Sequence, residues 1–208
     1  MTHSLRRLGV VLGLGLVLGA PGCGLTRRDY PERQQFVLNA PPPQSADPPA
    51  EGPVLGLSRF RASPLLSGTN FVYRTGDQVF VSDFYNVFWI PPAAMVAEST
   101  GRWLRVSGLF SQVTDPGGMA PRTLALEGAI AELYGDYRDP ATPAAVMGVR
   151  FALVDVQGRE PRLLFHKDYN VSRPIATATP AALAAGWNQA LGEILAALET
   201  DLRTTLRP

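Results

Sequence analysis

Apolar and polar residues alternate with a period of two along three long segments of the chain, residues 122–130, 145–156 and 162–171. Such alternation is typical of β-strands that bury one face. A glycine-containing turn at 157–161 joins the second and third segments as a predicted hairpin. The expected buried faces carry Leu124, Leu126, Ile130, Met147, Val149, Phe151, Leu153, Leu163, Phe165, Tyr169 and Val171.

Two helices are expected to cover the apolar face of this sheet. The first begins near Pro92 and runs toward Trp103, and Gly101 leaves its end open. In the second, at the C-terminus, Thr179 is placed to cap the helix and Pro180 to occupy its first turn. Apolar residues recur along this helix at three- and four-residue spacing, at Leu183, Trp187, Leu191, Ile194, Leu198 and Leu202.

The polar side of the C-terminal helix carries acidic rather than basic residues. This favours a helix packed on the core over one that lies on a membrane or binds a partner. Residues 36–39 predict a short strand, and residues 71–81 predict a second hairpin that turns at 75–78. The predicted fold class is α+β, a largely antiparallel sheet with one apolar face covered by two main helices, including a long C-terminal amphipathic helix.

The first 22 residues have the pattern of an export signal. Arg6 and Arg7 form a basic start, and an apolar run of about a dozen residues follows before small residues and Cys23. A transmembrane helix needs roughly 20 apolar residues, so this run is too short to serve as a permanent anchor. Residues 1–22 are therefore expected to be cleaved.

The sequence Ala-Pro-Gly-Cys at 20–23 resembles the signal of bacterial lipoproteins, in which the cysteine receives a diacylglycerol thioether and becomes the new N-terminus. Ala20 stands where that family prefers leucine. The resemblance implies lipidation of Cys23 with acyl chains such as palmitate, and two or more chains hold a protein on a membrane. Gly24, in place of the aspartate that marks inner-membrane retention, implies the periplasmic face of the Gram-negative outer membrane. An ordinary cleaved signal, which leaves a soluble exported protein, is the alternative.

Composition excludes several kinds of chemistry. The chain has 19 basic and 18 acidic residues, and removing residues 1–22 leaves 17 and 18, which argues against a nucleic-acid-binding domain. Lys167 is the only lysine and follows no glycine, so there is no P-loop. His166 is the only histidine after the signal, which leaves no Cys/His catalytic pair and no zinc cluster. We expect no enzyme activity, no cofactor, no metal and no nucleic-acid partner.

Asp136 and Asp139 are the remaining candidates for acid/base chemistry. They lie in a turn-rich segment, where solvated loop carboxylates are the expected identity. His166 points away from Phe165 on an alternating strand, and an exposed strand residue is expected there.

Three parts are expected along the chain: a signal peptide at 1–22, a tether at 23–35 and a folded domain at 36–208. Within the domain, six prolines in 14 residues predict an extended connector at 40–53. The tether can span at most about 45 Å at roughly 3.3–3.6 Å per residue, so the domain can stand off the membrane surface.

Four aromatic residues, Phe84, Tyr85, Phe88 and Trp89, lie between the second hairpin and the first helix. As core residues they fill the place where strand gives way to helix. As a site they offer a flat apolar surface that binds a lipid chain or a partner. Both interpretations stay open, and these residues are the candidates for partner or lipid binding.

Three short motifs carry a resemblance to a known family: GPVLGL at 52–57, FVYRTG at 71–76 and FYNVFWIPPAAM at 84–95. With the C-terminal Ala/Leu-rich helix, their order resembles the ABC-type transport auxiliary lipoprotein component family over nearly the whole mature chain. The resemblance implies a non-enzymatic auxiliary or adaptor protein of an MCE-type ABC transport system for lipids or similar apolar molecules. The implied partners are an MCE-domain periplasmic protein and the ABC permease and ATPase.

Two other functions fit the same anchor: a lipoprotein that carries a lipid ligand itself, and an assembly factor for another envelope complex. The adaptor predicts a filled core, whereas the carrier needs a cavity of several hundred cubic ångströms. A homo-oligomer is compatible with all three.

Overall fold

The computed structural model describes residues 32–42, 46–49, 51–118 and 121–207 of the 208-residue chain. All of these residues belong to one compact unit. The predicted signal peptide and the predicted lipidation site Cys23 lie outside the described residues.

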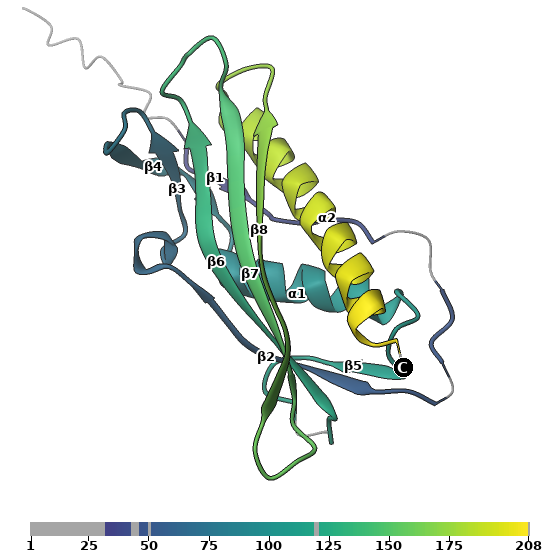
Figure 1. Ribbon diagram of the computed structural model, residues 1–208. Helices are drawn as coiled ribbons and strands as arrows, with labels where there is room; N and C mark the ends of the chain where they lie inside the picture. The colour runs from purple at the N-terminus through teal and green to yellow at the C-terminus, as the bar shows by residue number, and fades with distance from the viewer. Residues whose placement is uncertain (1–31, 43–45, 50, 119–120, 208) are drawn as a thin grey trace, which may run out of the picture. The chain divides into compact units, whose positions relative to one another are not determined.

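The described residues form an eight-stranded, largely antiparallel sheet (Figure 1). Its strands are β1 (Gln34–Phe36), β2 (Val54–Ala62), β3 (Asn70–Arg74), β4 (Phe80–Phe88), β5 (Gln112–Thr114), β6 (Leu124–Asp136), β7 (Ala144–Asp155) and β8 (Arg162–Pro174). The three longest, β6, β7 and β8, pair as consecutive antiparallel neighbours. They are the three segments in which the sequence alternates, and β3 and β4 form the second predicted hairpin.

The other edge of β6 is shared by two strands. β2 pairs in parallel with its first half, from Leu124 to Ile130, and β3 pairs in parallel with Gly135 and Asp136 at its end. β5 extends the sheet beyond β2, and β4 and β1 extend it beyond β3. Among the described residues, no strand pairs with this edge of β6 at 131–134, so the sheet is split there.

Two helices pack on one face of the sheet (Figure 1). α1 (Pro92–Arg105) contacts β2, and α2 (Pro180–Thr205) lies along β7 and β8. α2 begins as predicted, because the Thr179 hydroxyl accepts a hydrogen bond from the Ala182 amide at 3.3 Å. A single-turn 3-10 helix, η1 (Pro64–Leu66), follows β2. The α+β class expected from the sequence is confirmed.

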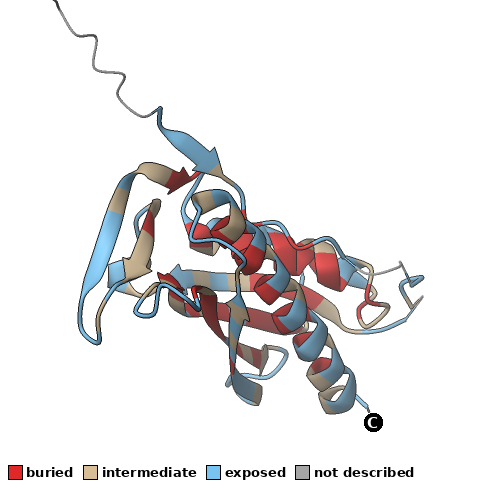
Figure 2. Ribbon diagram, turned by 90° about the horizontal axis from the view of Figure 1, so that it is seen from above, coloured by how far each residue is buried: buried red, intermediate tan, exposed pale blue. Residues whose placement is uncertain are grey.

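The predicted apolar faces meet in one core. Buried residues follow the sides of the helices that face the sheet (Figure 2). Trp187 of α2 is fully buried, packs against Phe71 and Phe88, and donates its indole N–H to the Val146 carbonyl at 3.1 Å. A buried indole with a satisfied N–H stabilises a core through both area and hydrogen bonding.

Each helix places a glycine against the sheet. α1 continues through Gly101 to Arg105, and a Cβ at Gly101 would lie 2.9 Å from Cδ1 of Leu57 on β2. A Cβ at Gly186 of α2 would lie 2.7 Å from Cβ of Ala145 on β7. The open helix end predicted at Gly101 is therefore a packing contact, where the missing side chain lets helix and strand approach.

Two expected strand positions differ from the structure. Leu163, expected to face the core, is 60% exposed, because a register shift between β7 and β8 places Leu164 in a bulge and reverses the alternation. The short strand expected at 36–39 occurs two residues earlier, as β1. Bulges and strand ends depend on pairing with distant residues, which local periodicity does not encode.

Candidate functional site

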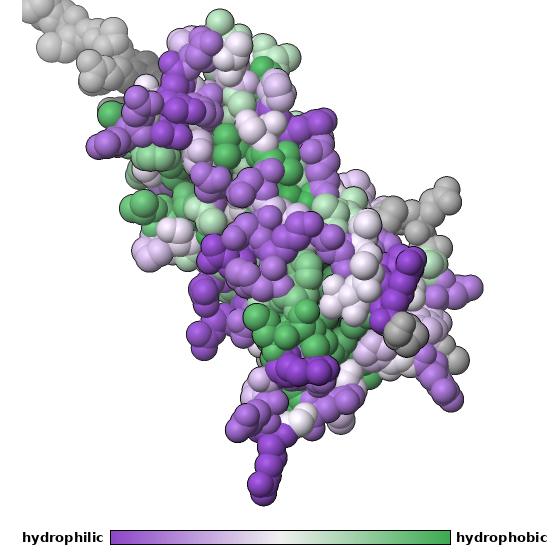
Figure 3. Space-filling model, viewed as in Figure 1, coloured by the Kyte–Doolittle hydropathy of each residue, from purple (hydrophilic) through white to green (hydrophobic). Residues whose placement is uncertain are grey.

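Apolar side chains are exposed on the β3–β4 hairpin and on η1, at the left of the view in Figure 3. Leu65 of η1 is 88% exposed, and Phe80 and Val81 of β4 are 50% and 47% exposed. Isolated exposed apolar residues are common, but a group of large ones on neighbouring elements marks a surface that binds something.

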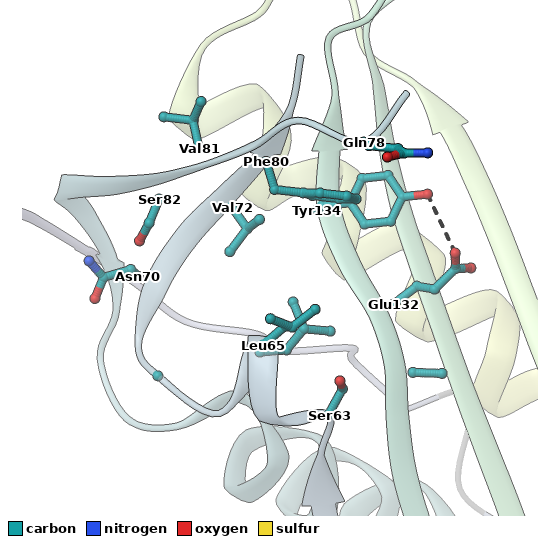
Figure 4. A pocket seen from close by; sticks show the side chains of 13 residues that line it. Ser63, Leu65, Asn70, Val72, Gln78, Phe80, Val81, Ser82, Glu132 and Tyr134 are labelled. Atoms are coloured by element: carbon teal, nitrogen blue, oxygen red, sulfur yellow. Dashed lines mark hydrogen bonds between the residues drawn. The ribbon is translucent and has the colours of Figure 1, made fainter. Parts of the chain in front are cut away.

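These side chains border an open groove of about 740 Å³ (Figure 4). Its walls come from η1, β3, β4 and the stretch of β6 that lacks a strand partner on this edge. The groove exists because β2 leaves the edge of β6 after Ile130 and β3 joins it only at Gly135. The lining side chains are those of Ser63, Leu65, Leu66, Asn70, Val72, Gln78, Phe80, Val81, Ser82, Ala131, Glu132 and Tyr134.

The groove also presents polar groups on several sides, among them Asn70 and Ser82 on one side and Gln78 and Glu132 on the other (Figure 4). The Tyr134 hydroxyl donates a hydrogen bond to the Glu132 carboxylate at 3.4 Å, as drawn in Figure 4. The ring of Phe80 meets that of Tyr134 edge to face, with centroids 5.5 Å apart, and the Arg74 guanidinium lies 5.7 Å and 6.0 Å from the two ring centroids. The arrangement suits a largely apolar ligand or peptide segment that also carries polar groups.

Asp83 holds a bulge in β4 next to the groove. Its carboxylate accepts hydrogen bonds from the Tyr85 amide at 2.8 Å, the Asn86 amide at 3.1 Å and the Tyr73 hydroxyl at 2.6 Å. Burial opposes the charge on Asp83, but these hydrogen bonds outweigh burial and lower the pKa of its carboxyl. Asp83 is therefore ionised at neutral pH, and it fixes the backbone that presents Phe84.

The structure divides the four aromatic residues singled out in the sequence. Phe84 and Trp89 are 70% and 64% exposed, and Tyr85 is half-buried with its ring edge-on to that of Phe84. Phe88 is only 2% exposed and packs on Phe71 in the core, with ring centroids 4.7 Å apart. Three of the four residues are thus accessible to a ligand or partner, and Phe88 supports the core.

The residues considered for acid/base chemistry are engaged in local contacts. Asp136 forms an ion pair with Arg138 at 2.6 Å, and hydrogen bonding from that guanidinium lowers the pKa of the Asp136 carboxyl. Asp139 accepts a hydrogen bond from the Ala141 amide at 2.9 Å, which lowers its pKa as well. His166 is exposed on β8, as expected. Both carboxyls are therefore ionised hydrogen-bond acceptors at neutral pH.

Within the described ranges, no group of three or more His, Cys, Asp or Glu residues is arranged to hold a metal ion. None of the helices found there is both long and apolar enough to cross a membrane.

The groove is the feature that sequence reasoning missed. Leu65 and Leu66 are consecutive leucines within the otherwise turn-forming sequence SPLLSGTN at 63–70. Two large apolar residues in such a turn were a usable signal, because adjacent exposed apolar residues contribute to the patches that mark interaction surfaces. The contribution of Glu132 and Tyr134 had no signal, since it depends on which strands pair with β6.

No family model and no curated protein matches this chain. Among solved structures, protein XCC0632 from Xanthomonas campestris, a DUF330 protein, is similar over 82% of this chain and 96% of its own, with 18% identity and a TM-score of 0.70. An uncharacterized protein covers 82% of this chain and 99% of its own, with 16% identity and a TM-score of 0.64. The lipoprotein GNA1162 from Neisseria meningitidis aligns with 10% identity over 74% of this chain and 99% of its own, at a TM-score of 0.40. The first two similarities show that the fold occurs in other proteins.

Proposed function

We propose that this protein is a non-enzymatic lipoprotein, held by an acylated Cys23 on the periplasmic face of the outer membrane. There it acts as the auxiliary or adaptor component of an MCE-type ABC transport system for lipids or similar apolar molecules. Its partners are an MCE-domain periplasmic protein and, through that protein, the ABC permease and ATPase.

The observation that carries the proposal is the apolar groove between η1, the β3–β4 hairpin and β6. Two of the three motifs behind the family resemblance, at 71–76 and 84–95, lie on this hairpin or follow directly from it. Phe80 and Leu65 leave large apolar areas in water, which is unfavourable by about 25 cal/mol per Å² until a partner covers them. A segment of the MCE-domain protein fits this requirement, because burying an exposed aromatic ring such as that of Phe80 in a contact removes a large apolar area from water.

A second candidate is a lipoprotein that carries lipid itself. The groove volume of about 740 Å³ favours it, since ligand sites usually measure about 300–1,000 Å³. The polar pair of Glu132 and Tyr134 would then contact the lipid headgroup, and the acyl chain of the lipid would lie along Val72 and Phe80.

Affinity purification of the lipoprotein from crosslinked cells, with both proteins and lipids identified, tests the two candidates. Phe80→Asp places a charge at the groove, and Leu163→Asp places one at a comparably exposed site on β8 as a matched control. The adaptor predicts recovery of the MCE-domain protein with the wild type and the control, and its loss with Phe80→Asp. Native mass spectrometry that finds about one lipid per chain, with no protein partner recovered, would instead establish the carrier.

A further inference from the structure

We propose that the end of β4 and the neighbouring residues after β1 contact the lipid bilayer and orient the domain on it. The contact surface, which we call the β1–β4 patch, is built from the exposed apolar residues of these two segments, Val37, Trp89 and Ile90 at the paired strand ends and Phe84 in the bulge of β4 before them. It is distinct from the groove, whose lining contains none of these residues. The inference rests on the proposed function in one respect, because it takes Cys23 as the membrane anchor.

All four residues of the patch are exposed: Val37 by 54%, Phe84 by 70%, Trp89 by 64% and Ile90 by 38%. The Trp89 amide donates a hydrogen bond to the carbonyl of Phe36 at 2.8 Å, so the two strand ends are tied side by side. Successive side chains of a strand point to opposite faces. Since Phe36 and Phe88 point into the core, Val37 and Trp89 point outward together.

The chain joins the domain beside this patch. β1 pairs in parallel with β4, with Gln34 opposite Asn86, so the residues that lead back to Cys23 join the domain close to Phe84. Ten residues lie between Cys23 and Gln34, and the eleven steps from one Cα to the other span about 36–40 Å when the chain is fully extended. The anchor therefore keeps the patch near the bilayer, and a contact that is weak for a free domain becomes effective through high local concentration.

The chemistry of the patch favours lipid over a protein partner. Its only side-chain polar group is the indole N–H of Trp89, and indole rings concentrate at the boundary between headgroups and acyl chains. The groove, in contrast, combines apolar walls with the Glu132–Tyr134 pair, as a specific site does. Insertion into a bilayer needs apolar area and no matching shape, which is what the patch provides.

Trp89 is a natural probe of this contact, because Trp103 and Trp187 are buried. The chain from Cys23 onward is coupled through its single thiol to a maleimide lipid in vesicles of phosphatidylethanolamine and phosphatidylglycerol. Phosphatidylcholine brominated in the upper part of its acyl chain then serves as the quencher. Subtracting the emission of Trp89→Phe from that of the wild type isolates the Trp89 signal. We expect this signal to shift to shorter wavelength and to lose more than half of its intensity to the bromolipid.

Leu163→Trp, made together with Trp89→Phe, places an indole at a similarly exposed site on β8 and is expected to escape quenching. Quenching of Trp89 by aqueous iodide but not by bromolipid would overturn the proposal. Equal quenching at both sites would also overturn it, because the patch would then not orient the domain. Protection of Trp89 by the MCE-domain protein in the absence of vesicles would assign the patch to a protein instead. Since the thiol is coupled chemically, a failure of Cys23 to become acylated in cells would overturn the proposed function and leave this result unaffected.

Discussion

The indole of Trp187 stands edge-on to the ring of Phe71, with the two centroids 4.8 Å apart. Phe88 packs on the same indole at a centroid distance of 5.3 Å. Residues from α2, β3 and β4 thus meet at one point of the core. The contact ties the C-terminal helix to the two strands, β3 and β4, that also form walls of the groove.

Trp187→Ala is therefore expected to lower the free energy of unfolding by about 3–5 kcal/mol, through the lost indole and the cavity it leaves. Trp89→Ala removes an indole that is 64% exposed and is expected to change stability by less than about 1 kcal/mol. Thermal and urea melts of both variants check these two expected stability changes. Equal midpoints for the wild type and Trp187→Ala would contradict the packing of Trp187 in the core.

The two glycines of α2 are expected to respond in opposite directions to alanine. Gly186→Ala sets a Cβ 2.7 Å from Cβ of Ala145, a short side chain that cannot rotate away, and is expected to destabilise by about 1–3 kcal/mol. Gly192 has open space around its Cα, so Gly192→Ala is expected to stabilise by up to about 1 kcal/mol through helix propensity. Urea unfolding of both variants gives the sign of each stability change. Stabilisation by both substitutions would disprove the close contact at Gly186.

Periodicity and turn residues predicted the two helices, the strands β6, β7 and β8 and the hairpins β3–β4 and β7–β8, but not β2, β5 or the pairing of distant strands. β6, β7 and β8 alternate over long segments and follow one another, so the signals for their hairpins are local. The pairing of β2 with the first half of β6 joins residues near 60 to residues near 128, and nothing in either segment specifies the other. The split in the sheet therefore had no local signal, and the only local sign of the groove was the pair of leucines at 65 and 66.

The aromatic segment before α1 illustrates the same limit. The cluster of four aromatic residues predicted either a core position or a surface position, and both occur. Phe88 is in the core because it pairs with Phe36, whereas Phe84 is exposed because it lies in the bulge held by Asp83. Three-residue β1 and its register decide which side chains point inward. The direction of these side chains thus depends on pairing with residues some 50 positions earlier in the chain, which the local sequence does not reveal.

Asp83→Ala is expected to destabilise the protein by about 1–3 kcal/mol, because it leaves the Tyr85 and Asn86 amides and the Tyr73 hydroxyl without their acceptor. Tyr73→Phe removes one of these hydrogen bonds and is expected to cost less. Asp77→Ala changes an aspartate that is 92% exposed and serves as the control. Hydrogen exchange at the Tyr85 and Asn86 amides is expected to accelerate only in the Asp83 and Tyr73 variants. Unchanged exchange in Asp83→Ala would show that the bulge forms without the carboxylate.

Asp201 makes stability depend on pH. Its carboxylate accepts hydrogen bonds from Nζ of Lys167 at 2.7 Å and from the Tyr169 hydroxyl at 2.6 Å, and these contacts lower the pKa of its carboxyl. A carboxyl whose folded pKa lies below its unfolded value of about 3.9 contributes stability above that pH and loses it as the pH falls through the folded pKa.

The difference in unfolding free energy between the wild type and Asp201→Asn is thus expected to be about 1 kcal/mol at pH 7 and to shrink as the pH falls below about 4. Taking the difference cancels the titration of other carboxyls common to both proteins. Urea titrations across this range measure it. A difference that stays constant with pH would mean that the ionised carboxylate gains nothing from Lys167 and Tyr169.

Cys23→Ala tests the anchor on which the proposed function depends. The described domain begins at Glu32, so the substitution is expected to leave its melting midpoint unchanged when the wild-type and variant domains are compared without lipid. In cells, the wild type is expected to incorporate radioactive palmitate and to fractionate with the outer membrane, because several acyl chains at about 0.8 kcal/mol per buried methylene hold it there. The variant is expected to take up no label and to leave the membrane fraction. A wild-type protein that is exported but carries no label would mean that residues 1–22 are an ordinary export signal, and that the domain reaches its partners without a lipid anchor.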